Sequence, residues 1–141
     1  MTSVERDRDV GNLLAEALAS WSDRPARVDE ASGETLTYAD ASRAVERIAA
    51  RLGDLGVRPG DRLLVRAATS LPAVLSCWAA WRIGAVPAPV DPSWPPWLVD
   101  PLLATLVPRL ELRDEGLASA SATIPSFAVA DRQGCPAETF L

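Results

Sequence analysis

The chain has 141 residues, a length that fits one domain better than two. Hydrophobic residues make up 48% and charged residues 23%, an ordinary composition for a soluble globular protein with a modest core. The net charge of −5 and the sequence pI near 4.7 argue against a protein that binds nucleic acid through phosphate contacts or that binds an anionic membrane surface.

The first predicted elements are a helix and a hairpin. Residues 1–11 are mostly polar and charged with no apolar signal region, and we expect them to form a flexible N-terminus. Asn12 is expected to cap a helix over about 13–21, because Asn is a preferred N-cap residue and the apolar residues after it share one face. Short strands over 26–29 and 35–37 flank a turn-rich segment, which predicts a hairpin.

The clearest helix signal begins at Thr37. Thr37 and Asp40 have the spacing of a capping box, in which the hydroxyl and the carboxylate satisfy free backbone N–H groups reciprocally. Gly53 and Gly56 favour a left-handed stop to this helix. Its residues separate at helical spacing into an apolar face of Val45, Ile48, Ala49 and Leu52 and a charged face of Arg43, Glu46, Arg47 and Arg51.

A strand over residues 62–67 is followed by an apolar helix over about 73–83. Ser70 is positioned to cap that helix, and Pro72 is tolerated in a first turn. Nearly every position around the helix is apolar, which is typical of a helix that is buried between other elements.

The strand predicted over residues 86–90 contains two prolines two positions apart. Pro87 and Pro89 lack N–H groups on the same flank, so that flank cannot form a normal ladder. On the opposite flank, Val86 and the residues at every second position after it keep their N–H donors. We therefore expect a strand that is fully paired on one side only, as at a sheet edge or a strand end.

The last third of the chain predicts one helix and two strands. After a rigid loop over 91–96, a helix lies between residues 97 and 107. Either Asp100 caps a helix that starts at Pro101, or Pro101 kinks a longer one. The remaining elements are short strands at 109–113 and 126–130, separated by a polar loop at 115–125.

This alternation of strands and helices predicts an α/β fold. We expect a partial three-layer α/β/α arrangement with a mostly parallel sheet, right-handed crossovers and helices on both faces. Residues 12–130 are expected to form a single α/β domain, and residues 131–141 a C-terminal tail without periodicity. The apolar run over 71–90 is interrupted by Arg82 and by prolines, so it is a poor membrane span.

The chain lacks two residue types on which many catalytic sites depend. All 14 basic residues are Arg, so there is no imidazole general base and no lysine amine. The glycines at 53, 56 and 60 follow a predicted helix, whereas a phosphate cradle needs glycines that lead into one, so we interpret them as turn residues. We predict no catalytic, cofactor-binding or metal-binding residue in this chain.

The two cysteines, Cys77 and Cys135, lie far apart in the sequence. Spacing alone leaves one disulfide open. Because the chain shows no export signal, they are better interpreted as reduced thiols in a cytoplasm.

Two tryptophans flank a Pro-Pro pair and form our candidate site. Trp94 and Trp97 suit a partner interface, because aromatic residues concentrate at such patches. An aromatic cage for a ligand is the alternative. Together with Pro87 and Pro89 of the predicted edge strand, they make up the surface at which we expect a partner to bind.

Three short segments carry a family signature. Residues 36–40 (LTYAD) are similar to an LTYxEL opening, residues 55–62 (LGVRPGDR) to an LGVxPGDRV turn, and residues 84–92 (GAVPAPVDP) to a GAVxVPLDP strand. In this order and spacing they resemble the N-terminal segment of the adenylate-forming (AMP-binding) superfamily: acyl-CoA synthetases, luciferases and the adenylation domains of nonribosomal peptide synthetases. The resemblance covers about residues 12–115.

The resemblance implies the fold of the N-terminal subdomain of an adenylation domain. It also implies a reaction, in which the family activates a carboxylic acid with ATP and passes the acyl group to a thiol. The family's phosphate loop ends in Pro-Lys-Gly and a second Lys lies near the C-terminus, and neither can be placed in a chain without Lys. We therefore expect no cofactor on this chain alone, and ATP and magnesium only in a completed enzyme.

Two functions are compatible with that resemblance. The first is the N-terminal half of a split acyl- or aminoacyl-adenylating ligase of a biosynthetic pathway, inactive by itself, whose partner is a complementary adenylation-domain chain. The alternative is a non-catalytic binding module that docks onto a synthetase or a carrier protein. A truncated or decayed gene product with no role is a third option. None of these partners is a nucleic acid or a membrane.

Overall fold

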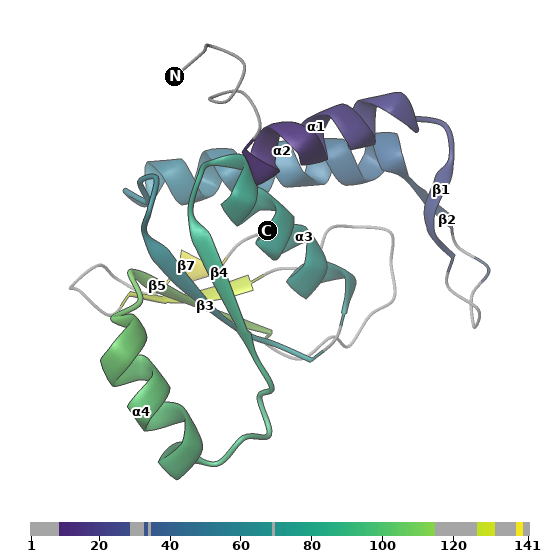
Figure 1. The fold of residues 1–141 in the computed structure, drawn as a ribbon. Coiled ribbons are helices and arrows are strands. Elements are labelled where there is room, and N and C mark those ends of the chain that lie inside the picture. The colour runs from purple at the N-terminus through teal and green to yellow at the C-terminus, as the bar shows by residue number, and fades with distance from the viewer. Residues whose placement is uncertain are drawn as a thin grey trace.

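The computed structural model describes residues 9–28, 33, 35–68, 70–114, 127–131 and 138–139. Predictions for residues 1–8, most of the hairpin turn, the loop at 115–125, Cys135 and most of the C-terminal tail lie outside these residues. The described elements are, in chain order (Figure 1), α1 (Val10–Ser20), β1 (Pro25–Val28), β2 (Thr35–Thr37), α2 (Tyr38–Asp54), β3 (Arg62–Arg66), α3 (Leu71–Arg82), β4 (Val86–Val90), α4 (Pro96–Leu106), β5 (Leu110–Asp114), β6 (Phe127–Asp131) and β7 (Glu138–Thr139).

Two separate sheets are present in the described part of the chain. Strands β1 and β2 form an antiparallel hairpin, as predicted. The main sheet has the order β4-β3-β5-β6-β7, with β4, β3 and β5 parallel, which confirms the predicted α/β class. Strands β6 and β7 extend it in the antiparallel sense. Strand β7 lies in residues 131–141, where the sequence shows no periodicity.

The two faces of the main sheet are covered by different helices (Figure 1). Leu63 and Val65 of β3 point to the main core, which α1, α2 and α3 close. Leu64, between them, packs with Val90 and Val99 in a smaller cluster under α4. This alternation follows from the two-residue period of a strand, and it produces the predicted three layers.

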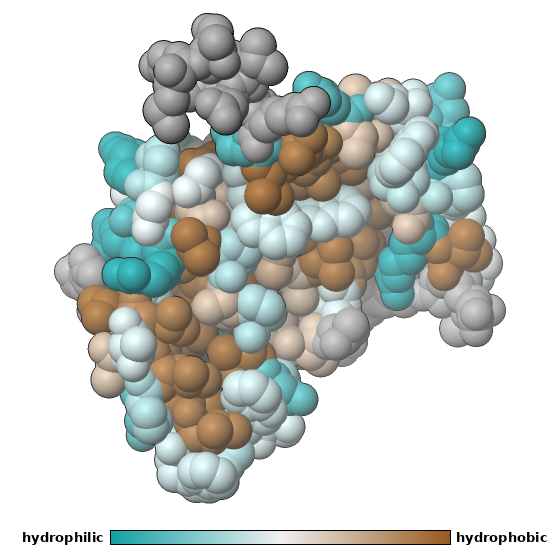
Figure 2. All heavy atoms as spheres, viewed as in Figure 1, coloured by the Kyte–Doolittle hydropathy of each residue, from teal (hydrophilic) through white to brown (hydrophobic). Residues whose placement is uncertain are grey.

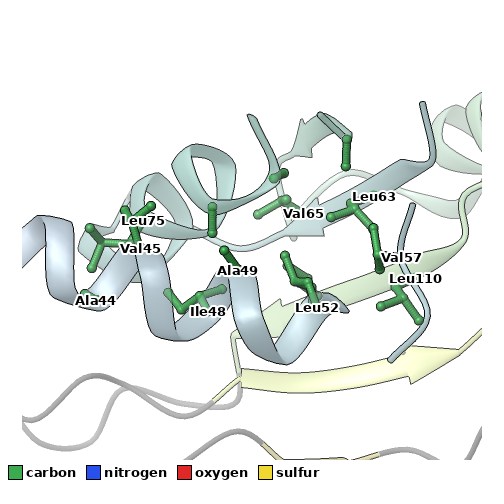
Figure 3. Close-up of a cluster of buried hydrophobic side chains, with 14 of the residues drawn as sticks. Ala44, Val45, Ile48, Ala49, Leu52, Val57, Leu63, Val65, Leu75 and Leu110 are labelled. Atoms are coloured by element: carbon green, nitrogen blue, oxygen red, sulfur yellow. The ribbon is translucent and has the colours of Figure 1, made fainter. Parts of the chain in front are cut away.

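Helix α2 supplies the broadest apolar face of the core, which Figure 3 shows turned toward α3 and β3. Its capping box forms as predicted: the Asp40 N–H donates to Thr37 Oγ1 at 3.1 Å, and the Thr37 N–H donates to Asp40 Oδ2 at 3.0 Å. Hydrogen bonds from the hydroxyl and the backbone N–H of Thr37 lower the pKa of the Asp40 carboxyl.

Helix α1 begins three residues earlier than predicted. Its N-cap is Asp9, whose Oδ1 accepts a hydrogen bond from the Asn12 N–H at 2.7 Å, so Asn12 lies in the first turn and is not the cap. Asp and Asn are equally good caps, and a carboxylate is also favoured by the positive end of a helix.

Helix α4 settles the alternative left open at Pro101. The helix runs from Pro96 through Pro101 to Leu106, so Asp100 is an internal residue and not a cap. Pro96 occupies the first helical turn, where a missing N–H costs nothing, and this allows the earlier start.

Helix α3 is less buried than its composition predicts. Ser70 caps it, with the Ala73 N–H donating to Ser70 Oγ at 3.4 Å. Leu75, Ala79 and Ala80 are buried, but Val74 is 37% and Trp81 38% exposed. The helix lies between α1, α2 and the sheet as predicted, and Val74 and Trp81 occupy the part of its circumference that these elements leave open.

Helices α1 and α3 approach closely at Gly11. An added Cβ at this position would lie 2.4 Å from the Trp81 carbonyl oxygen, so the two helix backbones would have to separate. Gly53, near the end of α2, has no atom within 4 Å of the corresponding position.

We expect Gly11→Ala to reduce the free energy of unfolding by about 1–3 kcal/mol, because overpacking displaces backbone. Gly53→Ala is the matched control and should leave the free energy unchanged or raise it by up to about 1 kcal/mol, since Ala is the better helix former. Urea denaturation of both variants measures the difference. Equal stability of Gly11→Ala and the unaltered chain would contradict the close approach.

Candidate functional site

The described residues hold few groups arranged for catalysis. Across the described part of the chain there is no group of three or more His, Cys, Asp or Glu side chains that could hold a metal ion. No helix among those same residues has both the length and the apolarity needed to cross a bilayer. Functional surfaces therefore have to be sought among the apolar and charged patches.

Two of the three predicted turn glycines have turn geometry. The third, Gly53, is a helical residue of α2 without a positive φ, so its prediction as a left-handed stop is wrong. Gly56 and Gly60 have φ values of 84° and 88°, which places both in the left-handed region that favours glycine. They connect α2 to β3, and the Gly60 N–H donates to the Gly84 carbonyl at 2.8 Å. This bond ties the turn before β3 to the turn before β4, so these glycines are scaffold residues as predicted.

Trp94 and Trp97 lie at the beginning of α4 and are both exposed. Asp91 Oδ1 accepts hydrogen bonds from the Ser93 hydroxyl at 2.6 Å and from the Ser93 N–H at 2.8 Å, which lower the pKa of the Asp91 carboxyl. The Trp94 N–H donates to the Asp91 carbonyl at 3.1 Å, which completes the turn. The turn leaves Trp94 40% exposed, and Trp97, in the first turn of α4, is 74% exposed.

Apolar surface gathers over α4 (lower left in Figure 2). We call Trp94, Trp97 and Val107, which are exposed at the two ends of this helix, the α4 surface. Exposed aromatic side chains such as those of Trp94 and Trp97 are characteristic of interaction sites.

Pro87 and Pro89 lie in the edge strand β4, as predicted. The Val86 N–H donates to the Asp61 carbonyl at 2.8 Å, so the paired flank of β4 faces β3. The two prolines present no N–H on the outer flank, and strand addition there would lack donors. They therefore do not support strand addition, and their part in a partner surface with Trp94 and Trp97 stays a prediction.

An apolar groove that the sequence did not indicate opens beside the hairpin. It has a volume of about 280 Å³. Its walls come from the hairpin, the start of α2 and the first turns of α3. The lining residues are Ala26, Arg27, Leu36, Ala41, Ser70, Leu71, Val74 and Trp78.

A buried carboxylate is the second feature that the sequence did not indicate. Glu111 of β5 has no exposed surface, and it lies on the face of the sheet opposite the main core. Its Oε1 is 3.0 Å from Arg113 Nε and 3.5 Å from Arg66 Nε. Arg66 and Arg113 pair across β3 and β5, so the sheet register brings the two cations to one carboxylate.

Comparison with known sequences identifies a family. Residues 14–131 match the family model described as AMP-binding enzyme. Surfactin synthase subunit 2 of Bacillus subtilis (strain 168) is 30% identical over 114 residues, which cover 81% of this chain and 3% of that protein. The 4-coumarate–CoA ligase CCL1 of Humulus lupulus is 33% identical over 81 residues, covering 57% and 15%. The chain therefore spans less than a sixth of the length of either relative.

Comparison with solved structures gives the same fold. The N-terminal subdomain of Klebsiella oxytoca NpsA matches with a TM-score of 0.69 and 21% identity, covering 81% of this chain and 29% of that chain. The fold expected from the three sequence segments is thereby confirmed.

We expect Glu111→Gln to reduce the free energy of unfolding by about 1.5–3 kcal/mol, because it removes the carboxylate that accepts a hydrogen bond from Arg113 and lies beside Arg66. Glu46→Gln is the matched control. Glu46 pairs with Arg82 at 2.7 Å, but the carboxylate is exposed and the arginine is half-buried, so the loss should be about 0.5 kcal/mol. Urea denaturation compares the two. A loss for Glu111→Gln no larger than that for Glu46→Gln would contradict a structural role of the buried carboxylate.

Proposed function

The chain belongs to the AMP-binding enzyme family, and from that premise we propose that it is the N-terminal half of a split acyl- or aminoacyl-adenylating ligase. It supplies part of the N-terminal subdomain as a scaffold. A complementary adenylation-domain polypeptide supplies the catalytic residues. The observation that carries the proposal is the match to this family over residues 14–131 by a segment that contains no Lys.

The residues of this segment do not fit a nucleotide site. The chain contains no Lys that could contact a phosphate. Among the described residues, the left-handed glycines lie in segments that lead into strands and not into a helix N-terminus: Gly33 before β2, Gly56 and Gly60 before β3, and Gly84 before β4. The described residues also lack a carboxylate cluster for a divalent cation. In this proposal ATP and magnesium are held by the complementary polypeptide.

We expect the chain by itself to give no ATP–pyrophosphate exchange, because it lacks the cationic amine of the family. Exchange should appear when the complementary polypeptide is added, and the complementary polypeptide alone is the control. Radiolabelled pyrophosphate incorporation into ATP, with a panel of carboxylic acids, measures the reaction. Exchange by the isolated chain would refute the proposal.

The α4 surface favours a second candidate function. A non-catalytic module that docks onto a synthetase or a carrier protein needs an exposed anchor, and Trp97 with 74% of its surface exposed has that character. One of the matched relatives is itself a subunit of a synthase. In this reading the segment has lost the reaction of its family and kept a scaffold that presents α4.

We expect Trp94→Ala and Trp97→Ala to weaken binding to such a synthetase or carrier protein at least tenfold, as loss of a hot-spot tryptophan does. Trp21→Ala is the control, because Trp21 is also exposed but lies beyond α1, with its ring 5.6 Å from that of Tyr38. Pull-down with purified partner proteins measures the effect. Unchanged binding by both α4 variants would remove this function.

A further inference from the structure

Two neighbouring strands of the main sheet send the chain in opposite directions from their carboxyl ends. After β3 the chain passes through α3, on the side of the main core, to β4 (Figure 1). After β5 it continues to β6, which lies on the other side of β3 and β5 in the sheet order. In open α/β sheets, ligands bind outside the carboxyl ends of the strands at such a point. The ends of β3 and β5 are therefore the position in this sheet that favours a ligand.

Two arginines occupy these strand ends. Arg66 is the last residue of β3, and the parallel register pairs it with Arg113, the last residue but one of β5. Successive residues of a strand alternate between its faces, and Val65 and Leu112 belong to the main core. Both arginines therefore lie on the opposite face of the sheet, together with Glu111.

Glu111 holds the two guanidinium groups together without neutralising them. Its Oε1 accepts a hydrogen bond from Arg113 Nε at 3.0 Å and lies 3.5 Å from Arg66 Nε. Two positive charges and one negative charge leave these three side chains with a net charge of +1. Charges at a partly buried position are costly unless they are compensated. The cluster therefore favours the addition of one more negative group.

The guanidinium of Arg66 also lacks a good hydrogen-bond acceptor. Its Nε is a buried atom and has no hydrogen-bond partner among the described residues. The 3.5 Å to Glu111 Oε1 is longer than an ordinary hydrogen bond. A buried donor without an acceptor costs desolvation free energy, which an arriving oxyanion would recover. The side chains of Arg66 and Arg113 are 26% and 48% exposed, so a ligand can reach them from solvent.

We propose that Arg66 and Arg113 form a binding site for the carboxylate group of a small monocarboxylic acid at the carboxyl ends of β3 and β5. One added carboxylate makes the cluster neutral, whereas a doubly charged phosphate would make it negative. Glu111 acts as a positioning residue that holds the arginines in place. The site is complete within this chain, so the inference does not depend on the complementary polypeptide.

The NMR signals of the arginine Nε–H groups report binding to the isolated full-length chain. Sodium acetate is the probe, and sodium chloride is withdrawn in step with it to keep the ionic strength constant. We expect the Arg66 signal to shift and to saturate. The Arg82 signal is the internal control and should not move, because Arg82 Nε pairs with Glu46 at 2.7 Å, outside the cluster. No saturable shift at Arg66, or an equal shift at Arg82, would overturn the proposal.

Two matched variants test which arginine is needed. Arg66→Gln should weaken acetate binding at least tenfold, because it removes a charged donor from the site. Arg82→Gln removes an arginine from another Arg–Glu pair and should leave the affinity unchanged. Shifts of the backbone amides of β3 and β5 measure both affinities, and circular dichroism verifies that each variant is folded. Equal affinities of the two variants would contradict the site, and the titration of the unaltered chain decides the question if Arg66→Gln does not fold.

Inorganic phosphate distinguishes a carboxylate site from a general oxyanion site. At a pH where phosphate is doubly charged, we expect it to bind the unaltered chain more weakly than acetate does. In Glu111→Gln the net charge of the cluster rises from +1 to +2, so the preference should move toward phosphate. Tighter binding of phosphate than of acetate by the unaltered chain would overturn the assignment of a carboxylate.

Discussion

Burial of β3 on both of its faces is the constraint on which the rest of the structure depends. Leu63, Leu64 and Val65 are consecutive residues with at most 1% of their surface exposed, so neither face of the strand can be left to solvent. A parallel strand of this kind needs helices on both sides. The layer formed by α1, α2 and α3 meets that need on one face, and α4 meets it on the other.

The proposed function follows from the surfaces that this arrangement of helices leaves exposed. Three helices serve one face and a single helix serves the other, and the hairpin is attached at the end of the first layer. The chain has the core of a small domain but carries surfaces that a self-sufficient domain would close. The α4 surface, the groove and the open hairpin all have this character. Under the proposed function, these are the surfaces against which a complementary polypeptide of the AMP-binding family would pack.

Local chemistry explains which parts of the fold could be predicted from the sequence. The capping box of Thr37 and Asp40 and the two prolines of β4 depend only on residues close to them in the sequence. Their geometry therefore follows from local stereochemistry. The N-terminus of α1 was misplaced because Asp9 and Asn12 are equivalent caps and only packing chooses between them. The start of α4 was left open for a related reason, since Pro is accepted both at the beginning of a helix and, with a local adjustment, inside one.

The candidate sites were harder to foresee, because they arise from tertiary structure. The groove is lined by residues from Ala26 to Trp78, and no periodicity within one element marks them as neighbours. Glu111 has the sequence context of a solvated strand residue, and only the pairing of β3 with β5 places it between two arginines. Trp97 was a candidate because aromatic residues concentrate at interfaces, but its exposure could not be predicted, since a helical pattern carries no information about how completely a helix is covered.

The proline-containing outer edge of β4 also bears on the association of this chain with copies of itself. An unpaired strand with a full set of donors is a template on which identical chains stack. Here the main sheet ends in a rim that offers carbonyl oxygens without their matching hydrogens, so a second copy finds no reciprocal ladder. The main sheet therefore cannot be extended by strand addition at β4, and this edge does not serve as a template for fibre formation.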